Sequence, residues 1–245
     1  MKIGRFSHRG EIYTGIVEGG SISVNGQKNR TYDIGDIKLL SPVLPSKIIC
    51  VGLNYKDHAS ELGMNIPEEP VIFMKPSTAL IGPNDCIVRP GKGIRVDHEA
   101  ELAIVVGKPA KNIEPEDASG HILGYTCLND ITARDIQKKD GQWTRCKSFD
   151  TFCPVGPWVE TEIDISDLRV RALVNGVIKQ DSSTRELIFG IDYIVSFISK
   201  IMTLLPGDII ATGTPPGVGP LSDGDVVAVE IDGIGKLTNY FKGME

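Results

Sequence analysis

Short apolar runs of strand length recur along this chain, and only one segment has the periodicity of a long helix. Residues 47–53, 71–74, 122–128 and 226–231 are apolar runs flanked by turn-forming residues, a pattern typical of β-strands. A doubly wound parallel sheet needs a helix after most of its strands. Since this chain lacks those helices, the pattern predicts a β-rich α+β fold.

The long helix is predicted over residues 191–205. Its apolar side chains form one stripe at helical spacing, which we interpret as core: Ile191, Ile194, Val195, Ile198, Met202 and Leu205. Pro206 and Gly207 should end the helix. Shorter helical segments are predicted at 54–62, ending at Gly63, and at 132–138, with Thr132 as the N-cap.

The first 43 residues are predicted to form a small β subdomain, and residues 44–245 the main domain. Strand-like runs at 12–17 and 22–24 are joined through Gly19-Gly20, a pair that tolerates the positive φ of a tight hairpin. The prolines of segment 41–46 favour an extended connector. Asn175-Gly176 predicts a second hairpin in the main domain.

Composition excludes several classes of protein. The 245 residues are 41% hydrophobic and 24% charged, an ordinary globular balance, and the net charge of −6 argues against a nucleic-acid partner. No apolar run is long enough to span a membrane, and the first residues lack the apolar segment of a secretory signal. The five cysteines include no Cys-x-x-Cys pair, which suits free thiols in a cytoplasmic protein.

Glu99 and Glu101 are the most informative candidate site residues. They precede the apolar run 102–106, so they are predicted to lie on the same strand, where residues i and i+2 face the same way about 7 Å apart. A hard divalent cation would relieve the repulsion between the two carboxylates. The alternative is a solvated strand face with two acids of no specific role.

Asp130 follows the apolar run 122–128 and could supply a third carboxylate. Three carboxylates and water molecules would complete an octahedral shell for Mg²⁺ or Mn²⁺. The spacing in the sequence does not by itself bring Asp130 to the two glutamates.

Other residues have chemistry that a metal site could use. His58 and Glu61 would share one face of a helix, where the carboxylate could orient the imidazole as a base. Lys75 and Lys147 could stabilise a developing enolate. Each has a simpler interpretation, surface decoration for the His-Glu pair and solvated loop charges for the lysines.

The turn at residues 211–219, Ala-Thr-Gly-Thr-Pro-Pro-Gly-Val-Gly, follows a predicted strand. Exposed amides and threonine hydroxyls make such a turn suitable for a carboxylate or phosphate. It lacks the Gly-Lys-Ser/Thr of a P-loop, so nucleotide binding is not expected.

Taken together, these motifs resemble those of the fumarylacetoacetate hydrolase family. The resemblance runs in order over roughly residues 45–240 and rests on Val51-Gly-Leu-Asn-Tyr-Lys-Asp-His58-Ala-Ser-Glu61, Phe73-Met-Lys-Pro-Ser77, His98-Glu-Ala-Glu-Leu102, Asn129-Asp-Ile-Thr-Ala-Arg-Asp135, Lys147-Ser-Phe149, Val174-Asn-Gly176 and Gly207-Asp-Ile-Ile-Ala-Thr-Gly-Thr-Pro215. The first 43 residues resemble the N-terminal extension of many prokaryotic members.

The resemblance implies a mixed β-sandwich roll that forms a homodimer and holds Mg²⁺ or Mn²⁺. It implies these roles: Glu99, Glu101 and Asp130 as metal ligands; His58 and Glu61 as a catalytic dyad on a helix over the ligand; Lys147 beside the substrate; Lys75, Arg134 and Gln137 along the pocket; and Thr214 at the substrate carboxylate.

The implied activity is on 2-oxo acids through a metal-bound enolate. The favoured reaction is C–C bond hydrolysis of a 3-acylpyruvate, with His58 activating water. The alternatives within the family are a 2-hydroxyhepta-2,4-diene-1,7-dioate isomerase or decarboxylase and an oxaloacetate decarboxylase or tautomerase. Outside it, a non-catalytic protein stapled by metal and an anion-binding module on the 212–219 turn remain open.

Overall fold

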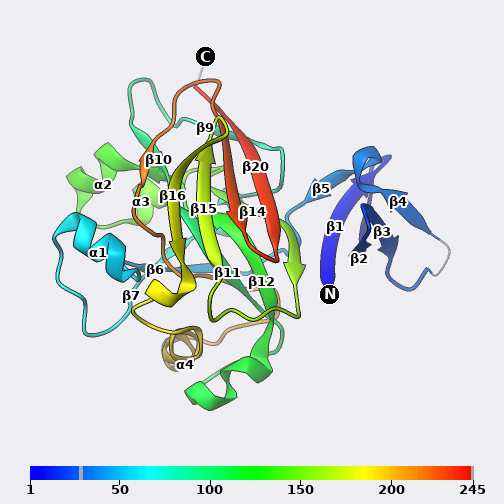
Figure 1. The fold of residues 1–245 in the computed structure, drawn as a ribbon, viewed down its shortest axis with the longest axis horizontal. Helices are drawn as coiled ribbons and strands as arrows, with labels where there is room; N and C mark the ends of the chain where they lie inside the picture. Colours follow the sequence, from blue (N-terminus) through cyan, green and yellow to red (C-terminus); the bar gives the residue numbers. More distant parts are fainter. Residues whose placement is uncertain (28–29, 244–245) are drawn as a thin grey trace.

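The computed structural model describes residues 1–27 and 30–243. Strands dominate it, as predicted, and the chain forms a large body with a small N-terminal unit at one side (Figure 1). Within the described ranges, no helix has the length and apolar character needed to cross a membrane.

The N-terminal unit is an antiparallel meander. Its strands are β1 (Lys2–His8), β2 (Glu11–Glu18), β3 (Ser21–Val24), β4 (Thr31–Asp33) and β5 (Lys38–Leu40). Gly19 and Gly20 connect β2 to β3 with φ angles of 55° and 86°, which confirms the predicted hairpin. Phe6, Val17 and Ile22 form the centre of its own small core.

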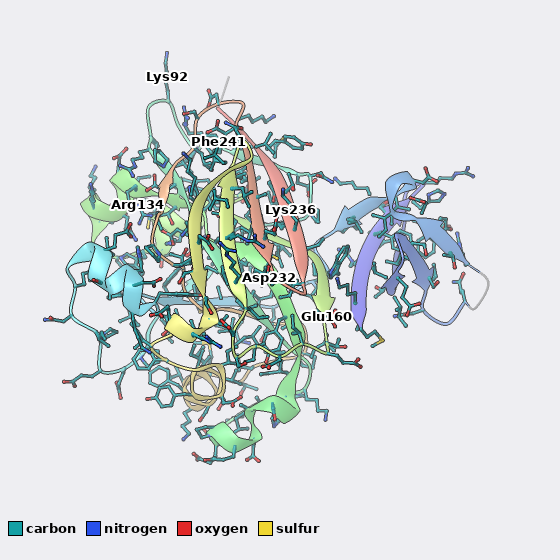
Figure 2. All side chains as sticks on the ribbon, viewed as in Figure 1. Lys92, Arg134, Glu160, Asp232, Lys236 and Phe241 are labelled. Atoms are coloured by element: carbon teal, nitrogen blue, oxygen red, sulfur yellow. The ribbon has the colours of Figure 1, made fainter. Side chains whose placement is uncertain are left out.

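This unit continues a sheet of the body. β1 pairs with β14 (Cys153–Glu160) through Lys2 and Ile3, and the N-terminal ammonium lies 2.5 Å from the Glu160 carboxylate. Figure 2 labels Glu160 at this junction. The strand order is β4-β3-β2-β1-β14-β12-β11-β17-β6-β7. The remaining strands of this path are β6 (Ile48–Gly52), β7 (Val71–Lys75), β11 (Ala100–Val106), β12 (Ile122–Asn129) and β17 (Ile209–Ala211).

A second sheet packs against the first to make a mixed sandwich. Its order is β16-β15-β19-β20-β9, from β9 (Cys86–Val88), β15 (Arg169–Val174), β16 (Val177–Ser183), β19 (Val226–Ile231) and β20 (Gly235–Lys242). The main core joins Leu102 and Ile104 of the first sheet to Val170, Val229 and other residues of the second. β15 and β16 are joined by Asn175 and Gly176 at φ angles of 51° and 79°, as the hairpin prediction requires.

Three short strands form a separate small sheet in the order β13-β10-β18, from β10 (Val96–His98), β13 (Thr132–Ala133) and β18 (Gly219–Pro220). One further short strand, β8 (Leu80–Ile81), runs parallel to β14. The helices are α1 (Lys56–Leu62), α2 (Arg134–Asp140), α3 (Thr144–Lys147) and α4 (Ile191–Ile201).

Two helix predictions need correction. α4 ends at Ile201, before the predicted end at Leu205, because the next residues are extended and Leu204 forms a β-bridge with Ala110. Leu204 is therefore buried while Leu205 is 43% exposed. Thr132 does not cap α2, which begins at Arg134; it pairs in β13, with its hydroxyl 3.1 Å from a Glu99 oxygen. Gly63 does end α1, in the left-handed conformation.

Candidate metal centre

Glu99 lies at a break between two strands. His98 ends β10 in the small sheet, and Ala100 begins β11 in the large sheet, so the prediction of one continuous strand is wrong. The Glu99 N–H donates to Asn129 Oδ1 at 3.0 Å, and its carbonyl accepts from the Asp130 N–H at 2.8 Å. These bonds tie the break to the end of β12.

The three predicted carboxylates meet at this break. Glu99, Glu101 and Asp130 each offer an oxygen within 4.8 Å of the others, and all three residues are buried. The register of β11 on β12 explains the meeting, because Ala100 pairs with Asn129 and so brings Asp130 beside Glu99. The interpretation as a solvated strand face is therefore excluded.

Three cations form ion pairs with two of these acids, Glu99 and Asp130. Lys147 Nζ lies 2.8 Å from Glu99 Oε2 and 2.6 Å from Asp130 Oδ2. Lys75 contacts the other Asp130 oxygen, and Arg134 Nη2 lies 2.5 Å from Glu99 Oε1.

The carboxylates differ in their electrostatic surroundings. Burial opposes ionisation of Glu99, but the charges of Lys147 and Arg134 outweigh it and lower the pKa of Glu99 to about 2. Burial, together with the charges of Asp130 and Glu99, raises the pKa of Glu101 well above its ordinary value. Glu101 instead accepts a hydrogen bond from the Gly213 N–H at 2.7 Å. Within residues 1–27 and 30–243, no basic side chain forms an ion pair with it.

This donor set fits a hard divalent cation. All three ligand groups are carboxylates, the oxygen donors that Mg²⁺ and Mn²⁺ prefer. Glu101 has no cationic partner in the described structure, and a metal ion would supply one. The ion's charge would replace the proton that burial favours on this carboxyl.

Arg134 is held by a second carboxylate and an amide. Its Nε donates to Asp97 Oδ2 at 3.0 Å, and its Nη1 donates to Gln137 Oε1 at 2.6 Å. Asp97 is itself buried and accepts two further hydrogen bonds from Arg95. These contacts fix the guanidinium at the start of α2, where Figure 2 labels it.

The predicted His-Glu pair forms on α1. His58 Nδ1 lies 2.8 Å from Glu61 Oε2, and the second oxygen of Glu61 accepts from the Gly217 N–H at 3.0 Å. α1 is thereby joined to the 211–219 turn. His58 lines the cavity, whereas Glu61 lies behind it and is partly exposed to solvent.

A cavity of about 220 Å³ lies over the carboxylates. All of the predicted site residues except Glu61 and Lys75 line this cavity. The predicted residues that line it are His58, Glu99, Glu101, Asp130, Arg134, Gln137, Lys147 and Thr214. The structure therefore brings together residues that come from the large sheet, from the loops that follow β12 and β17, and from α1, α2 and α3.

Two predicted pocket residues are placed differently from the expectation. Lys75 lies one layer below the cavity wall, fully buried, where its ammonium contacts Asp130 and the Ile131 carbonyl. Thr214 lines the cavity, but its hydroxyl donates to the Ala100 carbonyl at 2.9 Å. Its predicted contact with a substrate carboxylate stays a prediction.

The apolar half of the cavity was not predicted from the sequence. Leu62, Met64, Phe73 and Trp143 line it, with Phe73 and Trp143 packed edge to face at 5.2 Å. A Cβ atom on Gly52 would lie 2.5 Å from the Trp143 ring, so glycine is required there for this packing. Trp143 carries a weak sequence signal, as one of two tryptophans and only four residues before Lys147.

Comparison with protein families gives two matches that together span nearly the whole chain. Residues 47–242 match the fumarylacetoacetate (FAA) hydrolase C-terminal family, and residues 1–42 match the Rv2993c-like N-terminal family.

Two relatives illustrate the range of similar proteins. An uncharacterised protein of Methanocaldococcus jannaschii is 55% identical over 98% of both chains. A protein of Xenopus laevis named mitochondrial oxaloacetate tautomerase is 48% identical over 83% of this chain and 68% of its own.

Solved structures share the fold over the full length of both chains. A 5-carboxymethyl-2-hydroxymuconate delta-isomerase from Mycobacterium smegmatis matches with a TM-score of 0.94 and 47% identity. A maleylpyruvate hydrolase from Sphingobium sp. SYK-6, in complex with manganese(II) and pyruvate, matches with a TM-score of 0.85 and 31% identity.

Proposed function

The chain belongs to the fumarylacetoacetate hydrolase family, and from that premise we propose that it is a divalent-metal-dependent enzyme acting on 2-oxo acids through the enolate of their pyruvate half. The observation that carries the proposal is the buried cluster of Glu99, Glu101 and Asp130 beneath a cavity whose rim bears His58. The manganese and pyruvate bound to the maleylpyruvate hydrolase support the same chemistry here.

The three carboxylates would hold Mg²⁺ or Mn²⁺, which when bound supplies Lewis-acid polarisation of a 2-oxo acid. Lys147, between Glu99 and Asp130, would stabilise negative charge that develops on the 2-oxo oxygen. Arg134 and Gln137 would orient the substrate, because both line the cavity and are fixed to each other at 2.6 Å.

The favoured reaction is hydrolysis of a C–C bond in a 3-acylpyruvate. His58, with Glu61 at its Nδ1, would take a proton from water through Nε2. The resulting hydroxide would attack the distal carbonyl, and cleavage would release a carboxylic acid and the enolate of pyruvate. That enolate would be protonated to give pyruvate. The apolar wall of Leu62, Met64 and Trp143 would receive the acyl group.

A second candidate is tautomerisation of oxaloacetate. The 48% identity to the Xenopus laevis oxaloacetate tautomerase favours it. In keto–enol exchange His58 would remove the proton at C3 to give the enolate of the 2-oxo acid, and protonation of the 2-oxo oxygen would give the enol. An isomerase acting on a hydroxydienoate, as the name of the Mycobacterium smegmatis protein indicates for that enzyme, would also use this enolate.

The test is a substrate panel of acylpyruvates of increasing chain length, oxaloacetate and hydroxydienoates, each assayed with Mg²⁺ and with Mn²⁺. Turnover of acylpyruvates well above the other classes supports the hydrolase proposal. Faster interconversion of oxaloacetate tautomers would replace it with the second candidate. Glu99→Gln should abolish activity in either case, and Glu114→Gln, at an exposed carboxylate, is the control.

We also propose that the protein is a homodimer. Exposed apolar side chains such as Tyr193, Ile201 and Leu205 support association. Light scattering coupled to size exclusion measures the mass directly, and a value of one chain would reject the dimer.

A further inference from the structure

Gln180 is a buried polar residue on a strand that is otherwise open to solvent. It is 1% exposed and is the only fully buried residue of β16, which lies at one edge of the five-stranded sheet. Burying an amide stabilises a fold only when its hydrogen bonds are made. The partners of Gln180 therefore indicate what this residue does.

A β-bulge turns Gln180 inward. Ala172 pairs with Gln180 and Leu173 pairs with Ile178, so Lys179 is an extra residue in β16. The 211–219 turn packs directly on this bulge, since a Cβ on Gly217 would lie 2.1 Å from the Lys179 carbonyl oxygen. Gly217 also has a φ of 91°, which other residues rarely adopt.

The amide of Gln180 uses all of its hydrogen-bonding capacity. Oε1 accepts from the Ala100 N–H at 2.9 Å and lies 3.0 Å from His98 Nδ1. Nε2 donates to Thr214 Oγ1 at 2.8 Å and to the Pro215 carbonyl at 2.7 Å. The orientation of the amide is determined, because a backbone N–H such as that of Ala100 requires an acceptor.

Ala100 is the residue between Glu99 and Glu101. The Ala100 N–H donates to Gln180 Oε1, and the Ala100 carbonyl accepts from the Thr214 hydroxyl at 2.9 Å. Gln180 also contacts that hydroxyl. The neighbouring strand β17 pairs with β11 only from Ala103 onward. At Ala100, side-chain hydrogen bonds therefore take the place of the backbone hydrogen bonds of a neighbouring strand. The position of the Ala100 backbone sets the direction of both carboxylates.

We infer that Gln180 is a positioning residue that holds Glu99 and Glu101 at metal-binding spacing by clamping the Ala100 backbone to the 212–215 turn. The inference rests on the proposed function, because it assigns the carboxylates to a metal ion. Gln180 does not line the cavity, so it acts through its neighbours and not on substrate.

The test replaces the amide with an apolar side chain of similar size, Gln180→Met, and measures Mn²⁺ affinity of the full-length metal-free protein by electron paramagnetic resonance. We expect the Kd to rise by about 10- to 100-fold, as for other residues that orient metal ligands. The matched control is Asn239→Leu. Asn239 is equally buried in the same sheet and its amide also bonds two carbonyls, those of Gly82 and Asp85.

Asn239→Leu should lower the melting temperature but leave the Mn²⁺ Kd within about twofold of the wild-type value, since it lies outside the network. An unchanged Kd in Gln180→Met would overturn the inference. If that variant does not fold, Thr214→Val carries the test, because it breaks the bond to the Ala100 carbonyl without changing side-chain volume; an unchanged Kd there would equally overturn it.

The outcome is separable from that of the proposed function. Wild-type protein that binds Mn²⁺ but turns over no 2-oxo acid would reject the proposed function and leave the Gln180 measurement intact. If the wild-type protein is active and the Mn²⁺ affinity is unaltered in Gln180→Met and in Thr214→Val, only the role of Gln180 is rejected.

Discussion

The Nδ1 atom of His58 lies 2.8 Å from the Oε2 atom of Glu61 across one turn of α1. The remaining oxygen of Glu61 is bonded to the Gly217 N–H, so the carboxylate is held on both sides. This arrangement leaves Nε2 of His58 as the ring nitrogen that is free of the pair. A carboxylate at Nδ1 favours the proton on that nitrogen and makes Nε2 the basic atom.

His58→Asn should lower kcat for acylpyruvate hydrolysis by about 100- to 10,000-fold, because it removes the general base. Glu61→Gln should cause a smaller loss, since the amide can still accept from Gly217 but cannot stabilise an imidazolium. Steady-state kinetics measure both. Glu69→Gln, at an exposed position beyond the same helix, is the control and should keep wild-type activity. Equal activity in all three variants would remove the dyad from the mechanism.

Chelation should abolish turnover but leave the protein folded. Lys75 and Lys147 already neutralise Asp130, so the metal is not required to hold the carboxylates together. Treatment with EDTA should leave the far-ultraviolet circular dichroism spectrum unchanged and lower Tm by roughly 5–10 °C, the shift expected on losing a ligand present at about 100 times its Kd. Loss of secondary structure on chelation would instead support the metal-stapled alternative.

Metal affinity should weaken as the pH falls. Burial, with the charges of Asp130 and Glu99, raises the pKa of Glu101, so below that raised pKa a metal ion must displace a proton to bind. The Kd for Mn²⁺ should then rise by up to about tenfold per unit of falling pH. Calorimetric titrations in buffers of different ionisation enthalpy would measure the released proton directly. A Kd independent of pH would show that Glu101 is already ionised.

Glu101→Gln and Glu99→Gln should change the stability of the metal-free protein in opposite directions. A raised pKa means that the contribution of Glu101 is complete below its unfolded pKa and is lost as the pH rises. Glu101→Gln should therefore be more stable than wild type at about pH 8 and nearly equal to it at about pH 4.

Glu99 behaves in the opposite way, because its pKa is lowered from 4.5 to about 2. Its contribution is present above pH 4.5 and is lost as the pH falls toward 2. Glu99→Gln should then destabilise the neutral protein by about 3–5 kcal/mol, as when one partner of a buried ion pair is removed. Urea denaturation at each pH measures both effects, and equal shifts in the two variants would contradict the assignment of charges.

Substrate length should depend on the contact between Gly52 and Trp143. Gly52→Ala would push the Trp143 ring into the cavity, because the new Cβ would start 2.5 Å from it. Trp143→Ala would open the same wall. The ratio of kcat/KM for long over short acyl chains should fall in the first variant and rise in the second, each by about tenfold or more. Shifts in the same direction would show that Trp143 does not contact the acyl group.

Local patterns predicted the elements whose cause is local. Asn175 and Gly176 adopt the positive φ angles of a tight hairpin, and Gly63 ends α1 in the same region of conformational space. The helix at residue 191 also begins where its apolar stripe begins. The helix ends earlier than the pattern predicts, because Met202 is extended and Leu204 forms a β-bridge with Ala110.

The site was predictable as a set of residue types but not as an arrangement. Glu99, Glu101, Asp130, His58 and Lys147 were identified from motifs and spacing, and the structure gathers them around one cavity. The family resemblance places Lys75 along the pocket, yet its side chain is fully buried and contacts Asp130. No sequence pattern distinguishes a lysine that faces a cavity from one that supports its floor.

The sequence by itself determined the β-rich class, the family and the acids, bases and cations available to the site, since these depend on residue identity and local spacing. Only the tertiary structure decided that β11 starts after a break at Glu99, that β12 brings Asp130 to it, and that Gln180 reaches across from the second sheet. The physical reason is that these contacts join residues 30 to 80 positions apart, whose meeting depends on strand register and sheet packing.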